Sequence, residues 1–277
     1  MKVCDLHSHS NCSDGTFAPR ELVSLAKEIG LSALALTDHN TAKGLPEFME
    51  AGKKLGVTTV PGCEFSTEYN GTELHIVGLF LSKDVWGEIE DFVELMHMAK
   101  RESNKRLISA LNDAGYKLTY EEVANSTDAD EFNRAHVARV LTAKGYTKSV
   151  NEAFGNLLKE KHGYYIPPKK LASLYTVKFI KAIGGTAVLA HPFLNMSYDE
   201  LCEFLPKAKE AGLDAIETHY SKFTPQQTAQ AEELAKRFGL KQSGGSDFHG
   251  DTKPDISLGT GLGNLAVPYE FYENLIP

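Results

Sequence analysis

The sequence lacks the features of several protein classes. Its four cysteines show no CxxC spacing, and no signal peptide is predicted before the first strand, so we expect a protein of the reducing cytoplasm. No apolar run approaches the roughly 20 residues that a membrane helix needs, so we expect no membrane partner. Positive charge is not in excess either: the formal net charge of −8 argues against broad electrostatic capture of nucleic acid or anionic lipid. One locally positive pocket remains compatible with this charge.

The composition is otherwise that of an ordinary globular protein, with 42% hydrophobic and 24% charged residues. A chain of 277 residues can form one large domain, or a domain with an insertion, around a substantial core. No internal repeat or low-complexity segment interrupts the sequence, and nothing in it indicates a stable protein partner.

Short apolar runs alternate with amphipathic stretches at both ends of the chain. Strands are predicted at 3–7, 33–39, 57–66, 73–80, 185–193, 215–220 and 241–250. Helices are predicted at 19–30, 45–56, 205–212 and 225–239. This alternation is typical of parallel strands joined by helical crossovers, so we predict an α/β fold.

The middle of the chain lacks this alternation and has the hydrophobic pattern of helices. A helical period runs through 86–115 and is followed by shorter helical stretches, which end at "YYIPPKK". We therefore predict a helical insertion over 82–172, and a single domain formed by 1–81 together with 173–277.

Six of the ten histidines lie at or near the end of a predicted strand, and three carboxylates lie in equivalent places. The histidines are His7, His9, His39, His75, His191 and His249, and the carboxylates are Asp14, Glu64 and Asp247. In a barrel of parallel strands these ends meet on one face. A lone histidine at such a place is usually structural, but the joint pattern favours a divalent metal site, since a mixed His and carboxylate set suits Zn, Mn or Fe.

The same stretches resemble a known family. "DLHSHSNCSDG", "LTDHN", "PGCEFS", "AHP" and "GSDFHG" are similar to the motifs of the PHP (polymerase and histidinol phosphatase) superfamily of metal-dependent phosphoesterases. "NRAHVARVLTAKGYTKSVNEAFGNLL" resembles the stand-alone bacterial branch, which includes 3′,5′-nucleoside bisphosphate phosphatases and 5′-to-3′ exonucleases of short RNA. The resemblance implies a distorted (β/α)7 barrel with a helical insertion, and three divalent ions (Mn, Fe or Zn) at its carboxyl face.

The resemblance also implies which side chains hold each ion. The first ion is assigned to His7, His9, Glu64 and Asp247. The second is assigned to Asp14, His39 and His249. The third shares Glu64 and adds His75 and His191. Of these ligands, Asp14 and His191 are also expected to be catalytic.

Three further residues are expected near the substrate. Arg134 and His136 resemble phosphate clamps carried by the insertion, although Ala135 stands between them where relatives often have proline. Arginine suits this role because its guanidinium binds phosphate through two parallel hydrogen bonds. His219 follows a strand in "ETHY", and we expect it to face the substrate or to act as a general acid. Asp38, beside His39, is either a carboxylate supporting a ligand or part of a structural turn.

Charge balance points to an anionic substrate. Three divalent ions would carry a charge of about +6, which the three carboxylates only partly offset, and phosphate suits the remainder. A water between two ions would have its pKa lowered toward neutrality and act as the nucleophile. We therefore predict a metal-dependent phosphoric ester hydrolase acting on 3′,5′-bisphosphonucleotides or short 5′-phosphorylated RNA. The alternatives are a histidinol or sugar phosphatase, an amidohydrolase-type C–N hydrolase and a non-catalytic metal-binding module.

Overall fold

The computed structural model describes residues 2–127 and 132–277, which divide into two compact units. The first unit, here called the barrel unit, contains the residues up to Asp91 and Leu171–Pro277. The second, the helical unit, is Phe92–Lys170. The first boundary falls within the long helix α3 (Trp86–Asp113) rather than at residue 82.

The strands of the barrel unit form one sheet that curves into a nearly closed barrel. They are β1 (Val3–Asp5), β2 (Ala33–Leu36), β3 (Thr58–Tyr69), β4 (Thr72–Leu79), β5 (Leu171–Ala172), β6 (Thr186–Leu189), β7 (Ala215–Tyr220), β8 (Lys241–Gly245) and β9 (Val267–Pro268). Their order is β8-β7-β6-β4-β3-β2-β1-β9, and β5 pairs with β3. The Leu6 amide donates to the Gly244 carbonyl at 3.1 Å, which links β1 to β8 and closes the ring. The predicted α/β barrel is confirmed.

One strand departs from the parallel arrangement that the alternation predicts. β4 is antiparallel to both of its neighbours, β3 and β6. The two-residue turn Asn70–Gly71 joins β3 to β4, and both residues have positive φ (51° and 83°). Such a turn matches the twist of a tight antiparallel hairpin, so the chain reverses here without a helical crossover.

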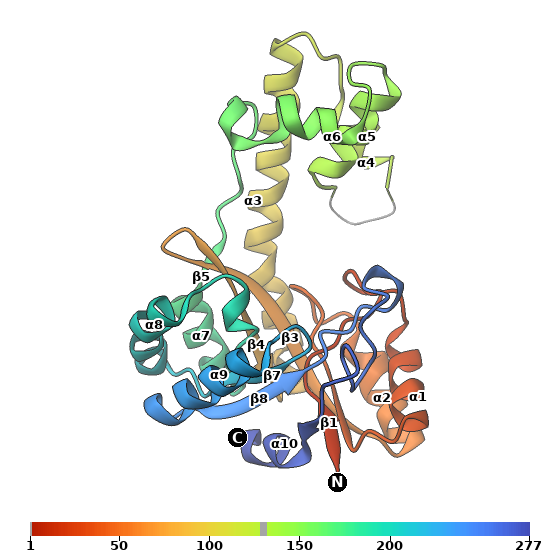
Figure 1. Ribbon diagram of the computed structural model, residues 1–277. Helices are drawn as coiled ribbons and strands as arrows, with labels where there is room; N and C mark the ends of the chain where they lie inside the picture. The colour runs from red at the N-terminus through yellow and green to blue at the C-terminus, as the bar shows by residue number, and fades with distance from the viewer. Residues whose placement is uncertain (1, 128–131) are drawn as a thin grey trace. The chain divides into compact units, whose positions relative to one another are not determined.

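Helices of the barrel unit cover the outside of the sheet (Figure 1). They are α1 (Pro19–Glu28), α2 (Leu45–Leu55), α7 (Ser173–Ala182), α8 (Tyr198–Ala211), α9 (Pro225–Phe238) and α10 (Tyr269–Leu275). α8 begins seven residues before the predicted start at 205, because Ser197 and Glu200 form a capping box that starts the helix there. α7 and α10 were not predicted.

The barrel interior below the candidate site is apolar. Leu6, Val60, Leu79 and Val188 belong to one buried cluster, to which the strand alanines also contribute. Polar side chains replace these apolar ones at the carboxyl end of the strands, where His7, His9 and Glu64 among others are fully buried. A packed apolar layer therefore supports the polar layer, which restricts its side chains to defined positions.

The helical unit has its own core. Beyond α3 it contains α4 (Tyr120–Ala124), α5 (Arg134–Ala143), α6 (Val150–Ala153) and a π-helical turn at Phe154–Leu158. Leu107, Leu111, Phe132, Val137 and Leu141 are buried together between these helices. None of the helices formed by residues 2–127 and 132–277 is long and apolar enough to cross a membrane.

Candidate metal centre

Two short segments carry four of the predicted residues and pair with each other. The Asp247 amide donates to the His7 carbonyl and the His9 amide donates to the Phe248 carbonyl, both at 2.9 Å. His7, His9 and His249 are almost completely buried. Because each segment places its two predicted ligands two residues apart, the pairing collects His7, His9, Asp247 and His249 at one end of the barrel.

Glu64 occupies the centre of this cluster, with five imidazoles around its carboxylate. Its Oε2 lies 3.1 Å from a ring nitrogen of both His7 and His39, and 3.2 Å from His9 Nε2. Its Oε1 lies 2.8 Å from His75 Nδ1 and 2.9 Å from His191 Nε2. His75 reaches Glu64 from the early part of β4, because an antiparallel strand starts at the end where its neighbours finish.

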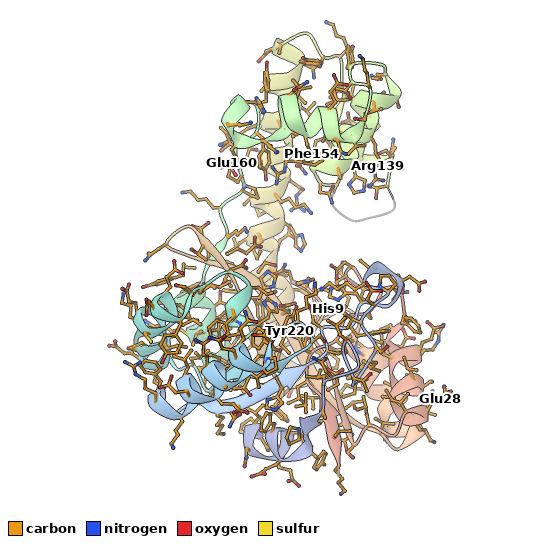
Figure 2. All side chains as sticks on the ribbon, viewed as in Figure 1. His9, Glu28, Arg139, Phe154, Glu160 and Tyr220 are labelled. Atoms are coloured by element: carbon orange, nitrogen blue, oxygen red, sulfur yellow. The ribbon has the colours of Figure 1, made fainter. Side chains whose placement is uncertain are left out.

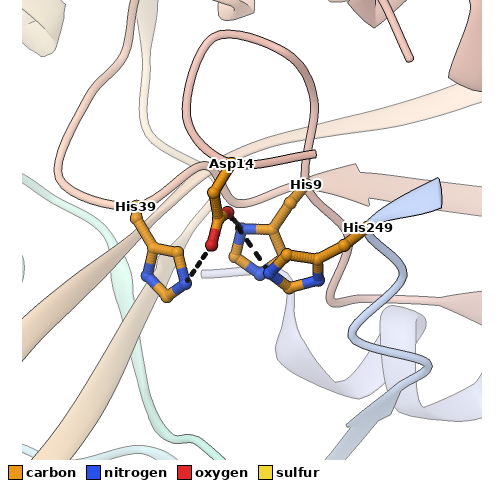
Figure 3. A group of neighbouring side chains, drawn as sticks. All are labelled: His9, Asp14, His39 and His249. Atoms are coloured by element: carbon orange, nitrogen blue, oxygen red, sulfur yellow. Dashed lines mark ion pairs between the residues drawn. The ribbon is translucent and has the colours of Figure 1, made fainter. Parts of the chain in front are cut away.

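A second group surrounds Asp14, which lies in the loop after β1. Asp14 points toward His39 and His249, with His9 beside them (Figure 3). Its carboxylate lies 3.2 Å from His249 Nε2, 3.9 Å from His39 Nε2 and 4.0 Å from His9 Nδ1. The Asp14 side chain is half exposed, whereas His9 and His249 are buried.

Two of the clustered residues have unusual backbone conformations. His191 (φ 28°) and Asp247 (φ 56°) lie in the left-handed region, which costs a non-glycine residue of the order of 1–3 kcal/mol. The His191 amide is held by Glu217 Oε2 at 2.5 Å and the Asp247 amide by the His7 carbonyl. The surrounding hydrogen bonds therefore maintain a conformation that directs both side chains toward Glu64.

The atoms that face one another have the properties of metal ligands. Five buried side-chain atoms of the cluster have no hydrogen-bond partner: His7 Nε2, His9 Nδ1, His9 Nε2, His39 Nδ1 and Glu64 Oε2. Leaving such atoms unsatisfied in a protein interior is costly, and cations bound within the cluster would satisfy those that offer a lone pair. Three groups of side chains have potential ligand atoms within 4.8 Å of one another. They are His9, Asp14, His39 and His249; His7, His9 and Glu64; and His39, Glu64 and His75.

Hydrogen bonds fix which imidazole nitrogen faces the centre. Glu217 Oε1 binds His7 Nδ1 at 2.7 Å, and the Asp247 carbonyl binds His249 Nδ1 at 2.8 Å. Each acceptor holds the proton on Nδ1, so the lone pair is on Nε2, which faces Glu64 in His7 and Asp14 in His249. This is the usual arrangement of metal-binding histidines and their supporting groups, and the residues present fit divalent metal ions.

The electrostatics of the cluster show strong coupling between its acids and bases. Burial alone raises the pKa of Glu64, but the adjoining His7, His39 and His75 lower it well below its usual value. Burial opposes protonation of His9 and His75, yet hydrogen bonds to Asp247 and Glu64 raise the pKa of His9 to about 9, and the charge of Glu64 raises that of His75 to about 10. Burial lowers the pKa of His39 to about 3. Cations that bind to this cluster therefore compete with protons for the imidazoles of His9 and His75.

Protein stripped of metal is expected to lose stability as the pH rises from about 6.5 to 10. In the folded protein the pKa values of His9 (about 9) and His75 (about 10) exceed 6.5, the ordinary value that applies to the unfolded chain. Both charged rings therefore stabilise the fold fully below pH 6.5. That contribution, of the order of a few kcal/mol, disappears as the rings deprotonate. Urea unfolding in EDTA between pH 6 and 10 measures it. A free energy of unfolding that rises over this range contradicts the expectation.

Comparisons with known proteins agree with this geometry. The PHP domain family matches residues 5–166. The chain belongs to the PHP domain family. It is 33% identical over 252 residues to a 5′-3′ exoribonuclease of Haemophilus influenzae, covering 90% of each chain. It is 28% identical to a 3′,5′-nucleoside bisphosphate phosphatase of Chromobacterium violaceum, covering 90% of this chain and 88% of the relative.

The structural comparison supports the same family. A Bifidobacterium adolescentis protein described as a metal-dependent phosphoesterase superimposes with a TM-score of 0.75 and 26% identity, covering 99% of this chain and 95% of the other. As a PHP protein with named phosphatase and phosphodiesterase relatives, the chain is a metal-dependent phosphoric ester hydrolase.

The PHP centre opens to a cavity of about 300 Å³. It is lined by His39, Glu64, Glu73, His75, His191, Leu194, Asn195, Tyr220, Lys222, Asp247 and Lys253. His9 and Tyr220 lie at the same end of the barrel (Figure 2). The cavity size suits a phosphate group with part of the ester that carries it.

His219, which was expected to face the substrate or to act as a general acid, lies apart from this cluster. Its Nδ1 lies 2.9 Å from Thr218 Oγ1, its ring packs edge-on against Phe271 of α10, and its Nε2 lies 4.0 Å from Glu232 of α9. The cause is a register shift between Glu217 and His219 where β7 pairs with β8. An irregularity of this kind re-aims side chains, so Glu217 faces the centre and His219 the outer helices.

The sequence patterns missed several residues that support the centre. Glu217 holds His7, and the Tyr220 hydroxyl and the Lys253 ammonium each donate to Asp247 Oδ2 at 2.8 Å. Asp5 accepts hydrogen bonds from the Ser246 amide and the Gly259 amide. The bond from Ser246 anchors the segment that precedes Asp247. A glutamate directly after the apolar pair Ala215–Ile216 in a predicted strand is a signal that could have indicated Glu217.

Asp38 takes the structural one of its two predicted roles. It accepts hydrogen bonds from the Ser10 amide at 2.7 Å, the Ser10 hydroxyl at 2.6 Å and the Ser13 hydroxyl at 2.6 Å. Asp38 therefore fixes the loop between His9 and Asp14.

Arg134 and His136 lie in the helical unit, at the start of α5. The Arg134 guanidinium stacks over Tyr165 with its carbon 4.1 Å from the ring centre, and it donates to the Leu158 carbonyl at 3.1 Å. His136 Nδ1 accepts from the Asn133 amide at 3.0 Å, and burial together with Arg139 and Lys100 lowers its pKa. This end of α5 is therefore rich in positive charge.

Proposed function

We propose that this protein hydrolyses phosphate esters of small nucleotides, either 3′,5′-bisphosphonucleotides or short 5′-phosphorylated RNA. The observation that carries the proposal is the position of the Glu64 carboxylate at the carboxyl end of the strands of a PHP barrel. Nitrogens of five histidines lie within 3.2 Å of this carboxylate. The relatives named exoribonuclease and nucleoside bisphosphate phosphatase support the substrate class.

We propose three divalent ions, of Mn, Fe or Zn, as the cofactors. The first would be held by His7, His9, Glu64 and Asp247. The second would be held by Asp14, His39 and His249. The third would be held by Glu64, His75 and His191. His39 also lies within ligand distance of Glu64 and His75, so a further contribution from His39 to the third ion is compatible with the geometry.

When bound, the ions supply positive charge that binds phosphate oxygens and lowers the pKa of a water. The chain's own residues orient that chemistry. Glu64 presents one carboxylate oxygen to each side of the cluster, and Asp14 lies at the exposed edge, where its carboxylate can hold and align a water. His191, held by its backbone bond to Glu217, lines the cavity and is placed to stabilise or protonate the departing oxygen.

We also propose that the barrel unit carries the chemistry and that the insertion over 82–172 contributes substrate contacts through Arg134 and His136. The concentration of Arg134, His136, Arg139 and Lys100 around the start of α5 supports this, since it would attract a phosphate. The guanidinium of Arg134 keeps donors beyond the one that binds Leu158, because arginine has five N–H groups.

Replacing Arg134 with alanine is expected to raise KM about 10-fold and leave kcat within about threefold. A charge-assisted phosphate contact contributes roughly 1–3 kcal/mol to binding. Steady-state kinetics on 3′-phosphoadenosine 5′-phosphate measure both constants, and Arg134→Lys, which keeps the charge, should recover part of the loss. Thermal melting of each variant controls for the lost stacking on Tyr165. An unchanged KM in a folded Arg134→Ala protein removes Arg134 from the substrate site.

A substrate panel on protein of measured metal content tests the proposed function. The panel contains 3′-phosphoadenosine 5′-phosphate, a short 5′-phosphorylated RNA, histidinol phosphate, a sugar phosphate and an amide. Turnover of either nucleotide substrate at rates well above the others supports the proposal. Preference for histidinol or sugar phosphate, hydrolysis of the amide, or metal binding without any turnover would each favour one of the alternatives instead.

A further inference from the structure

Two lysines line the cavity of the candidate metal centre, and no motif accounts for them. Lys222 follows β7 in the loop that leads to α9, and Lys253 follows the turn at Gly250–Thr252. Lys222 is exposed, whereas the Lys253 side chain is 31% exposed and directed at Asp247. Both lie in the barrel unit, so their relation to the centre is fixed within one compact body.

Asp247 uses its two carboxylate oxygens for different purposes. Oδ1 faces the imidazoles, 3.2 Å from His9 Nε2 and 3.8 Å from His7 Nε2. Oδ2 faces away from them and accepts from the Tyr220 hydroxyl and the Lys253 ammonium, each at 2.8 Å. Asp247 therefore holds Lys253 beside the cluster while leaving Oδ1 directed at the ligand atoms.

This position favours an anion once cations bind. An ammonium near divalent ions is repelled by them, and additional negative charge in the same cavity reduces that repulsion. Lysine carries three donors, of which the bond to Asp247 uses one. A compact ammonium with free donors at the wall of a metal cavity suits the oxygens of a phosphate.

We propose that Lys253 binds the phosphate group undergoing hydrolysis, assisted by the exposed Lys222 at the same cavity. The proposal rests on the proposed phosphoesterase function and deepens it. Lys253 donates to a nonbridging phosphate oxygen and so offsets the negative charge of that group. Asp247, whose Oδ2 is itself bound by the Tyr220 hydroxyl, holds the ammonium in place before the substrate arrives, which lowers the entropy lost on binding.

The test compares Lys253→Gln, Lys253→Arg and Lys222→Gln with a control, Lys54→Gln. Lys54 is an exposed surface lysine paired with Glu50 on α2. Inorganic phosphate is the probe, and its affinity for manganese-loaded protein is measured by calorimetry together with bound manganese. We expect Lys253→Gln to weaken phosphate binding about 10-fold or more, Lys222→Gln about threefold, and Lys54→Gln not at all. Lys253→Arg should retain most of the affinity, and manganese content should be unchanged.

Two results of the binding experiment would overturn the inference. One is unchanged phosphate affinity in folded, manganese-loaded Lys253→Gln protein. The other is a loss of manganese that accounts for the weaker phosphate binding, because Lys253 would then act only on Asp247. Turnover of nucleotides separates the two proposals. Lys253-dependent phosphate binding without nucleotide hydrolysis supports this inference and contradicts the proposed substrate, whereas equal hydrolysis by wild type and Lys253→Gln contradicts this inference alone.

Discussion

Replacing Glu64 with glutamine is expected to lower the phosphoesterase rate about 10³-fold or more and to remove about two equivalents of bound metal. The amide keeps the size of the side chain but loses the charge that all five neighbouring imidazoles face. Because Glu64 belongs to two of the three proposed ligand sets, both of their ions are affected. Metal analysis by mass spectrometry and kcat on a nucleotide substrate measure the two effects.

Glu68 on the same strand provides the matched control for Glu64. Its side chain is exposed, so Glu68→Gln should keep the metal content and a rate within about twofold of wild type. The Glu64→Gln protein should also titrate differently, since the charge of Glu64 is the main cause that raises the pKa of His75, and Glu64 raises the pKa of His9 together with Asp247. A Glu64→Gln enzyme that retains both metal and rate is incompatible with a centre organised around this carboxylate.

The position of the metal-ligand cluster could be predicted because the sequence pattern indicates where the strands end. His7 and His9 lie at the end of one predicted strand, and Asp247 and His249 lie at the end of another, so both pairs were expected at the same face of the barrel. The backbone bonds between these two segments place them there. His39, Glu64 and His191 follow the same rule, which depends only on strand period and on the rigidity of the sheet.

The position of His219 shows where that rule fails. In a regular strand Glu217 and His219 share a face. A single register shift between them separates the two side chains, and nothing in the local sequence marks its position.

Two other differences between the predicted and the observed fold, the direction of β4 and the start of α8, had signals in the sequence. Asn70–Gly71 is a strong hairpin signal, but the surrounding strand and helix alternation favoured parallel strands, so the antiparallel β4 was unexpected. Ser197 and Glu200 are spaced as a capping box, a signal for a start of α8 earlier than the predicted residue 205. Contacts with the sheet stabilise both elements, and a single sequence does not contain those contacts.

Replacing Asp14 with alanine is expected to lower kcat about 10²–10³-fold while removing only about one equivalent of metal. Asp14 belongs to one proposed ligand set, with His39 and His249, and its side chain is half exposed, so the fold should tolerate the change. Asp251, an exposed aspartate in the neighbouring loop, is the matched control, and Asp251→Ala should retain rate and metal. The metal loss of Asp14→Ala should be smaller than that of Glu64→Gln. Equal metal losses in the two variants would contradict a centre in which Glu64 is shared between ions and Asp14 is not.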